Sequence, residues 1–358
     1  MKRDLETIWT ELERIASEDV RPFVERVDLD GRGRVTVCAT MDAGSRWFQA
    51  DERGVHELWP SDETRVPLAR RIADGQTVLS YRPRRRIVLF EGEGGRLAVR
   101  KGFRSKAFAA AAASNALGAR LCAGTGFDAP AIEEFREEDA SLRMSLLPGS
   151  EPELTADARE TWFRIGAGLR AFQERPAPVA RGPFGPAEEM TVLAVRRERT
   201  ERVIALPEGC EDLASRLFWI ARRLPEPVLG NAHRDLHDHQ LRVGEGRIGL
   251  LDFDLLTRAD VALDAANLLA HLTLRALQGV RGATRASVNR IGEAFLEGLH
   301  RSDEESFWQR LRFYQATTFA RIALVYLVRP RWSHLAGELL ELARRCAEEA
   351  EREGRVVH

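Results

Sequence analysis

Residues 233–240 read His-Arg-Asp-Leu-His-Asp-His-Gln, and residues 250–254 read Leu-Leu-Asp-Phe-Asp. This short segment holds a candidate catalytic carboxylate (Asp235), a candidate amide metal ligand (Gln240) and a second carboxylate (Asp252). Phosphoryl transfer needs these three parts, because one group must orient the acceptor hydroxyl and two oxygen ligands must hold Mg²⁺ against the phosphates. The spacing from Asp235 to Gln240 matches the H-R-D-L-x-x-x-N catalytic loop, with Gln in the place of Asn.

The apolar runs on either side of Gly244-Glu245-Gly246 predict a short hairpin formed by residues 241–243 and 248–251. The residues before this hairpin then lie on a loop. Asp252 directly follows a buried strand, a position where a polar side chain is held rigidly, as a site requires. The alternative interpretation is that these polar side chains only form hydrogen bonds within a loop and a turn. The order and short separation of the two motifs favour the catalytic interpretation.

Residues 229–272 resemble the aminoglycoside phosphotransferase/choline kinase family, which comprises small-molecule kinases of the protein-kinase-like fold. That family carries H-G-D-L-H-x-x-N, then an apolar strand that ends in I-D-[FW]-[DE], then a helix that begins with D-x-A. The matching positions here are His233, Asp235, Leu236 and His237, then residues 251–254, then residues 263–266. The resemblance is specific over these residues, weaker over the rest of the chain from about residue 76 to the C-terminus, and absent before residue 76. It implies transfer of a phosphate from ATP or GTP to a hydroxyl group of a sugar, amino alcohol or aminoglycoside-like acceptor.

The resemblance also implies roles for single residues. Asp235 would accept or orient the proton of the acceptor hydroxyl. Asp252 would bind Mg²⁺ that bridges the phosphates, and Gln240 would stand in for the usual asparagine ligand with a stem one methylene longer. Asp254 is either a further metal ligand or a residue that orders the loop.

His233 and Asp264 match family positions that brace the catalytic loop and take no part in the chemistry. Arg234 replaces the glycine that is usual in the small-molecule family. His237 and His239 form an H-x-H pattern, but no cysteine or further histidine completes a zinc ligand set at the usual spacing. The four cysteines are scattered, which is typical of free thiols in a reducing compartment.

The region before the catalytic segment has the pattern of a nucleotide-binding sheet. Residues 76–81, 86–91 and 96–101 predict three consecutive strands, and an alanine-rich helix is predicted over 105–121. Kinases place a lysine on their third strand to contact the α- and β-phosphates. Lys101 at the end of the third predicted strand is the candidate. Its alternative role is a solvated cation at a strand end.

Two usual parts of this kinase lobe are missing. The predicted helix 105–121 contains no acidic residue, so the usual lysine–glutamate pair is lost or replaced by Asn115 or Ser114. The turn expected to cover the phosphates is rich in arginine where glycine is usual. We hypothesise that Arg84 or Arg85 contacts the phosphates, because guanidinium forks match phosphate oxygens; a solvated hairpin tip is the alternative.

The apolar residues before Pro148-Gly149 resemble the hinge of the family, where backbone groups contact the edge of the adenine. The predicted hinge residues are Ser145, Leu146 and Leu147. An ordinary core strand is the alternative, because the same side chains suit both roles.

The periodicity of the whole chain predicts an α+β protein with a protein-kinase-like bilobal fold. We expect an accessory α/β extension over 1–74, a kinase-like N-lobe over 75–148 and a helical C-lobe over 149–358. The extension is predicted to contain a helix over 3–16, strands over 34–40 and 46–50 and a short helix over 63–73. An extended loop is predicted over 175–187. Two further strands are predicted over 131–135 and 142–147, and two hairpin turns over 41–45 and 92–95. The remaining predicted elements are helices, over 156–173, 213–224, 262–277, 287–299, 305–328 and 334–353.

Charge and hydropathy narrow the partners. The chain has 54 Lys and Arg and 55 Asp and Glu, a net charge of −1, so no global basic field attracts nucleic acid or a membrane surface. No apolar run approaches the length of a membrane span, and the first residues lack the apolar core of a signal peptide. We therefore expect a cytoplasmic protein whose partner is a small-molecule hydroxyl acceptor. The oligomeric state stays open.

A rival interpretation comes from outside the enzymes. The missing helix glutamate, the missing glycine loop and Gln240 in place of Asn are consistent with a kinase-like protein that binds nucleotide or acts as a scaffold with weak or no turnover. Among enzymes, inactivation of an aminoglycoside is a further option. The sequence does not point to it, because the one dense acidic run, over 348–353, has the pattern of a solvated helix face.

Overall fold

The computed structural model describes residues 4–41, 44–72, 76–93, 96–177, 182–301 and 306–356. The described residues form two compact units. The first comprises residues from Met1–Trp59, Gly185–Pro225 and Trp308–His358, and the second comprises residues from Pro60–Phe184 and Glu226–Phe307. Within the described ranges, no helix has the length and apolar character needed to cross a bilayer.

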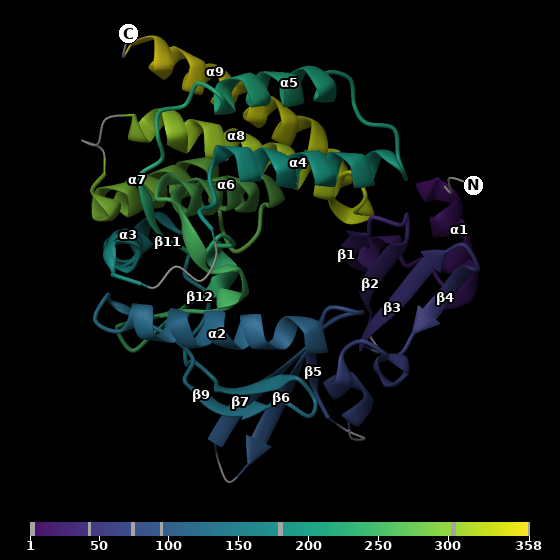
Figure 1. Cartoon of the computed structure of the whole chain (residues 1–358). Coiled ribbons are helices and arrows are strands. Elements are labelled where there is room, and N and C mark those ends of the chain that lie inside the picture. Colours follow the sequence, from purple (N-terminus) through teal and green to yellow (C-terminus); the bar gives the residue numbers. More distant parts are fainter. Residues whose placement is uncertain are drawn as a thin grey trace. The chain divides into compact units, whose positions relative to one another are not determined.

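The first unit contains a helix and a four-stranded antiparallel sheet (Figure 1). The elements are α1 (Leu5–Ala16), β1 (Val24–Leu29), β2 (Val35–Met41), β3 (Gly44–Asp51) and β4 (Gly54–Leu58), and the strand order is β1-β2-β3-β4. Asp4 caps α1 by accepting a hydrogen bond from the Thr7 N–H at 2.8 Å. The apolar face of α1, with Trp9 and Leu12, shares one buried cluster with residues of the sheet such as Phe48. The helix and the middle two strands are predicted from sequence, whereas β1 and β4 are not.

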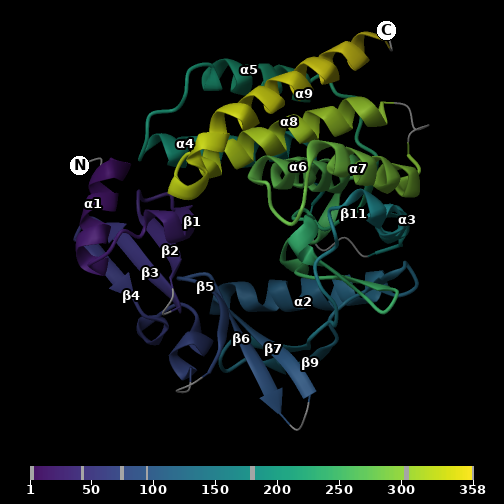
Figure 2. The ribbon, with the colours of Figure 1, turned by 180° about the vertical axis from the view of Figure 1, so that it is seen from behind.

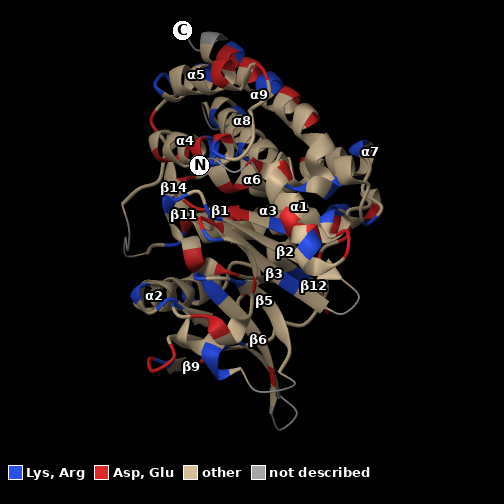
Figure 3. Cartoon of the chain, turned by 90° about the vertical axis from the view of Figure 1, so that its right-hand side faces the viewer, with Lys and Arg blue, Asp and Glu red and all other residues tan. Residues whose placement is uncertain are grey.

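Four helices complete the first unit: α4 (Pro186–Glu201), α5 (Cys210–Ala221), α8 (Phe307–Tyr326, from Trp308 on) and α9 (Ala336–Val356). Helix α4 corrects the end of the loop predicted over 175–187. Its start is set by Pro186 at the first helical position and by the Glu188 carboxylate, which accepts from the Gly185 N–H at 2.8 Å. The helix is hard to recognise from sequence, because charged residues occupy much of it. Both signs of charge alternate along α9 (Figure 3).

The second unit begins with a five-stranded antiparallel sheet and one long helix. Its elements are β5 (Val78–Arg82), β6 (Arg86–Glu93), β7 (Arg96–Phe103), α2 (Ser105–Cys122), β9 (Ile132–Arg136) and β10 (Ser141–Ser145), and the strand order is β5-β6-β7-β10-β9. Lys101 lies on the central strand, opposite Val88 on one side and Leu142 on the other. In place of the short helix predicted over 63–73, the chain forms a shorter 3-10 helix at Pro67–Arg71, with another 3-10 helix before it at Pro60–Asp62. A proline begins each of them.

The rest of the second unit is mostly helical, with two small sheets. Its elements are β8 (Phe127–Asp128), α3 (Arg159–Glu174), β11 (Leu229–Ala232), β12 (Leu241–Gly244), β13 (Arg247–Leu250), β14 (Thr257–Asp260), α6 (Ala262–Gln278) and α7 (Arg285–Leu299). Helices α3 and α7 lie side by side (Figures 1 and 2). They touch through backbone atoms, since a Cβ on Gly166 would lie 2.0 Å from the Phe295 carbonyl oxygen and one on Gly298 would lie 1.9 Å from the Phe163 carbonyl oxygen. The predicted hairpin turns include residues 42–43 and 94–95, which lie outside the described residues, as do residues 178–181 of the predicted loop.

Helix α2 lies against the segment that follows β13 through a close contact between a glycine and an aromatic ring. A Cβ on Gly118 would lie 2.2 Å from the ring of Phe253, which forms the 3-10 turn Phe253–Leu255. Phe253 is buried and lies between Asp252 and Asp254 in the chain. The absence of a side chain at 118 therefore lets the helix approach both carboxylates.

We expect Gly118→Ala to destabilise the second unit. Alanine gains about 1 kcal/mol of helix propensity over glycine, but overpacking of a tight contact costs about 1–3 kcal/mol. With ring atoms as close as 2.2 Å, the steric cost outweighs the gain. The free energy of unfolding in urea should therefore fall. Ala113→Leu is the matched control, since Ala113 is exposed on the same helix and should tolerate a larger side chain. An increase in stability for Gly118→Ala would contradict the packing described.

Candidate active site

A lysine and two aspartates meet at the end of β13. The Lys101 amine donates to Asp252 Oδ1 and to Asp254 Oδ1, each at 2.7 Å. The lysine side chain is 5% exposed, and those of the aspartates are 18% and 20% exposed. The sequence-predicted residues Lys101, Asp252 and Asp254 are thus in direct contact, although 151 residues separate the first from the second.

An arginine absent from the predicted site completes this cluster. Arg86 Nη1 lies 2.8 Å from Asp252 Oδ2 and 3.0 Å from Asp254 Oδ2. Arg86 is the first residue of β6 and pairs with Phe103, two residues beyond Lys101 on β7. Because alternate residues of paired strands share a face, Arg86 lies on the face of the sheet that carries Lys101. The strand pairing could have singled it out from its neighbours Arg84 and Arg85.

The four charges of the cluster balance. Burial raises the pKa of the Asp252 carboxyl, but the charges of Lys101 and Arg86 outweigh it and hold that pKa far below its usual range. Burial lowers the pKa of Arg86, and the two carboxylates outweigh it in the same way, so that the pKa is raised. Asp252 and Arg86 are therefore charged at neutral pH.

Asn115 on α2 reaches the same cluster, as one of the two residues expected in place of a helix glutamate. Its amide donates to Asp254 Oδ1 at 3.0 Å and to the Ala111 carbonyl at 2.9 Å. The helix thus contributes a neutral donor to an aspartate, in place of a negative charge next to Lys101. The two aspartates themselves act as the counter-ions of Lys101.

The backbone of the catalytic loop is fixed by Asp264, which lies in the first turn of α6 and is buried. Its carboxylate accepts from the His233 and Arg234 N–H groups, each at 2.7 Å. Burial raises the pKa of Asp264, and the two backbone N–H groups act in the opposite direction. His233 Nε2 donates to the Leu251 carbonyl at 2.6 Å, and its Nδ1 accepts from the Asp235 N–H at 3.3 Å. A neutral imidazole with its proton on Nε2 satisfies both contacts and connects Asp235 to the residue before Asp252.

Arg234 stands where the family has glycine, and the structure gives the reason for that preference. Its φ of 68° lies in the left-handed region, which glycine adopts at little cost. Here the strained residue is held by its N–H contact to Asp264 and by its guanidinium, which lies 3.7 Å from the centre of the Phe184 ring.

Gln240 lies beside the end of β13, where Asp252 follows. The backbone carbonyl of Gln240 accepts from the N–H of Leu251, the residue before Asp252, at 2.9 Å. Its amide Nε2 lies 3.4 Å from His237 Nε2. Burial lowers the pKa of His237 to about 4, although the nearby charge of Asp235 acts to raise it.

The turn Asp238–Gln240 is fastened by an ion-pair network that the sequence analysis does not predict. Asp238 is fully buried and accepts from Arg275 Nε at 3.0 Å and from Arg281 Nη2. Glu151 accepts from Arg281 at 2.5 Å and contacts His239 at 2.5 Å. Ligand atoms of Glu151, Asp238 and His239 lie within 4.8 Å of one another, but both carboxylates already contact guanidinium groups. This cluster braces the predicted catalytic loop.

The predicted hinge follows β10. The Ser145 N–H donates to the Ala131 carbonyl at 2.9 Å, and the Leu146 N–H donates to the Leu97 carbonyl at 3.3 Å. Within the described part of the chain, the Leu147 N–H forms no hydrogen bond. The Leu147 side chain packs on Gly249, where a Cβ would lie 2.7 Å from it.

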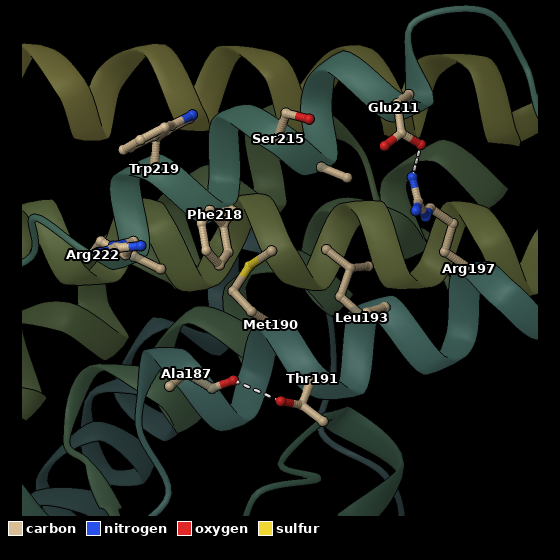
Figure 4. A pocket seen from close by; sticks show the side chains of 13 residues that line it. Ala187, Met190, Thr191, Leu193, Arg197, Glu211, Ser215, Phe218, Trp219 and Arg222 are labelled. Atoms are coloured by element: carbon tan, nitrogen blue, oxygen red, sulfur yellow. Dashed lines mark hydrogen bonds and ion pairs between the residues drawn. The ribbon is translucent and has the colours of Figure 1, made fainter.

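A separate pocket of about 610 Å³ lies in the first unit, between α4 and α5 (Figure 4). Met190, Leu193 and Phe218 form much of its lining, and an ion pair between Arg197 and Glu211 borders it. None of the site residues predicted from sequence lines this pocket. It lacks the combination of lysine and paired carboxylates that phosphoryl transfer needs.

The donor set at the end of β13 fits a hard divalent cation. Asp252 and Asp254 direct their carboxylate oxygens to the same two cationic groups, so the oxygens of both converge on one place. Carboxylate and amide oxygens are the ligand types that Mg²⁺ prefers. Asp252 and Asp254 could hold the ion, with Gln240 as the neighbouring amide.

Comparison with solved structures identifies the fold. A choline/ethanolamine kinase family protein from Mesorhizobium loti has a TM-score of 0.55 and 14% identity, over 82% of this chain and 95% of that chain. Choline kinase LicA from Streptococcus pneumoniae has a TM-score of 0.54 and 15% identity, over 80% and 96%. Aminoglycoside phosphotransferase APH(3'')-Id from Streptomyces rimosus has a TM-score of 0.51 and 19% identity, over 75% and 96%. The predicted α+β, protein-kinase-like fold is confirmed.

Comparison of the sequence with known families completes the identification. No curated protein matches the sequence. The model of the phosphotransferase enzyme family matches residues 84–314. This range is more than half of the 358 residues and includes Lys101 of the sheet and Asp235 of the catalytic loop, so the resemblance noted in the sequence is confirmed. The chain belongs to the phosphotransferase enzyme family.

Proposed function

We propose that this phosphotransferase moves the γ-phosphate of ATP to a hydroxyl group of a small molecule. The observation that carries the proposal is the direct contact of Lys101 with both Asp252 and Asp254. A lysine and paired carboxylates are the parts that position nucleotide phosphates and their metal ion. The loop that carries Asp235 is bound to the same strand end, because His233 of the loop donates a hydrogen bond to the Leu251 carbonyl.

In this mechanism Asp235 orients the acceptor hydroxyl and takes up its proton as the phosphate is transferred. Asp252, Asp254 and the amide oxygen of Gln240 would hold Mg²⁺, which would supply positive charge to the phosphate oxygens. Lys101 releases part of its contact with the aspartates and binds the phosphates. Arg84 and Arg85 remain predicted phosphate contacts from the turn before β6.

The adenine is proposed to bind beside the hinge. The Ser145 and Leu146 N–H groups already have carbonyl partners, so the Leu147 N–H is the donor that can bind the edge of the base. Two of the similar structures carry adenine nucleotides, one AMP-PNP with Ca²⁺ and the other AMP. ATP and Mg²⁺ are therefore our proposed co-substrate and metal, with GTP as the alternative co-substrate.

The acceptor is proposed to be a sugar, an amino alcohol or an aminoglycoside-like compound. The similar structures include a choline kinase and an aminoglycoside phosphotransferase in complex with ADP and streptomycin. We place the protein in the cytoplasm, a proposal supported by its four free cysteines.

One observation favours a second candidate function. Both carboxylates of the proposed metal site already have cationic partners, and the helix supplies Asn115 in place of a glutamate. A protein that binds nucleotide and turns it over weakly or not at all would show the same features. Turnover with a panel of acceptors separates the two candidates.

We expect Asp235→Asn to lower kcat by about 10²–10⁴-fold, because the variant cannot take up the hydroxyl proton. Binding of AMP-PNP with Mg²⁺, measured by calorimetry, should change little. The activity assay should follow ADP formation with choline, ethanolamine, several sugars and streptomycin as acceptors. A wild-type chain that binds nucleotide but produces no ADP above the Asp235→Asn background would favour the non-enzyme candidate.

Acid should destabilise the protein through His237. Its folded pKa of about 4 lies below the value of about 6.5 in an unfolded chain, so its contribution to stability is complete above pH 6.5 and is lost as the pH falls towards 4. Between pH 7 and pH 5, the free energy of unfolding in urea should fall by about 1–2 kcal/mol less for His237→Gln than for the wild type. The exposed His334, changed to Gln, is the control and should follow the wild type. Equal losses in all three proteins would show that His237 does not stay neutral in the folded chain.

A further inference from the structure

We infer that Arg86 binds the nucleotide phosphates together with Lys101, and that it holds the two carboxylates of the proposed metal site until nucleotide arrives. This inference rests on the proposed function and deepens it. It assigns two tasks to one arginine. Arg86 binds the phosphates, as a glycine-rich loop usually does, and it controls whether the carboxylates are free to bind a metal ion.

The first observation is the way the carboxylate oxygens are used. Lys101 contacts the Oδ1 atoms of Asp252 and Asp254, and Arg86 contacts the Oδ2 atoms of both. Every oxygen of the two carboxylates therefore has a cationic donor within 3.0 Å. A metal ion that binds these oxygens must displace a donor or approach a guanidinium of the same sign of charge.

The second observation is the charge of the cluster. Two cations and two carboxylates sum to zero in the structure. A divalent cation alone would leave two uncompensated positive charges in a partly buried place, which is costly. A metal–nucleotide complex brings negative phosphates along with the metal. The cluster therefore favours joint arrival of metal and nucleotide over binding of the metal alone.

The third observation concerns the backbone of the arginine-rich turn. The Arg84 N–H donates to Glu63 Oε2 at 2.5 Å, and the Arg85 N–H donates to the Arg82 carbonyl at 2.9 Å. These two N–H groups are used within the protein, so the turn cannot cradle phosphates as a glycine-rich loop does. The phosphates need a side-chain donor from this turn.

Arg86 is suited to that task. Its Nε is buried and, within the described residues, has no hydrogen-bond partner, so half of its fork is unused. Phosphate oxygens accept from Nε and Nη together in a bidentate contact. Arg86 also lies on the same face of the sheet as Lys101. A move from the carboxylates to the phosphates would complete its donor pairing and free the Oδ2 atoms for the metal.

The test uses Arg86→Met in the full chain, with two binding measurements that do not depend on turnover. Binding of Mn²⁺ alone, followed by electron paramagnetic resonance, should become about tenfold tighter, because a competing cation is removed. Binding of AMP-PNP in the presence of Mg²⁺, followed by calorimetry, should become about tenfold to a hundredfold weaker. Arg86→Lys keeps the charge but not the fork, so it should leave Mn²⁺ binding near the wild-type value and weaken nucleotide binding.

Arg143→Met is the matched control. Arg143 also contacts two carboxylates, those of Glu91 and Glu133, but it lies on the opposite face of the same sheet from Lys101. Both affinities should stay within about twofold of the wild type. Circular dichroism and thermal unfolding of each variant establish that the chain is folded.

The two affinities must change in opposite directions in Arg86→Met. Mn²⁺ binding that stays the same or weakens would overturn the inference, and so would unchanged nucleotide binding. If Arg86→Met does not fold, Arg86→Lys decides, since nucleotide binding equal to that of the wild type would then overturn it. A wild-type chain that binds no nucleotide would refute the proposed function, whereas the Mn²⁺ measurement would still report whether Arg86 occupies the metal ligands.

Discussion

The second unit of this protein depends on four charges that lie far apart in the sequence. Lys101 and Arg86 come from neighbouring strands of the sheet, and Asp252 and Asp254 follow a strand more than a hundred residues later. Charges this far from bulk water are stable only when they are paired. The pairing therefore fixes the sheet against the catalytic segment. It also keeps Asp252 ionised, as its proposed role of metal ligand requires.

Uncharged contacts hold the same arrangement from behind. The ring of Phe253 fits against Gly118, so α2 comes close enough for Asn115 to reach Asp254. On the other side, Asp264 binds two consecutive N–H groups of the catalytic loop. The surrounding structure maintains the positive φ angles of Arg234 and Asp252. Backbone strain of this kind is usually found at functional sites.

The site departs from the usual kinase pattern in a consistent way. The helix glutamate is replaced by Asn115, so the counter-ions of Lys101 are the aspartates themselves. The glycine-rich turn is replaced by one whose backbone N–H groups are already bonded, and Arg86 supplies positive charge there. Both changes make the cluster more positive, so Lys101 and Arg86 together balance the charges of the two aspartates.

The sequence by itself determined the family and the α+β class and led to the proposed catalytic residues, because short motifs such as 233–240 depend only on local spacing along the chain. Lys101 could also be predicted from the sequence, since the pattern of a strand and the position of its end are local properties. Arg86 could not, although Arg84 and Arg85 beside it were considered, because the choice among three arginines depends on which one shares a sheet face with Lys101. The buried network around Asp238 was hidden for the same reason. Strand register and long-range charge pairing are decided only when distant segments pack together, and a one-residue difference in register turns a side chain to the opposite face.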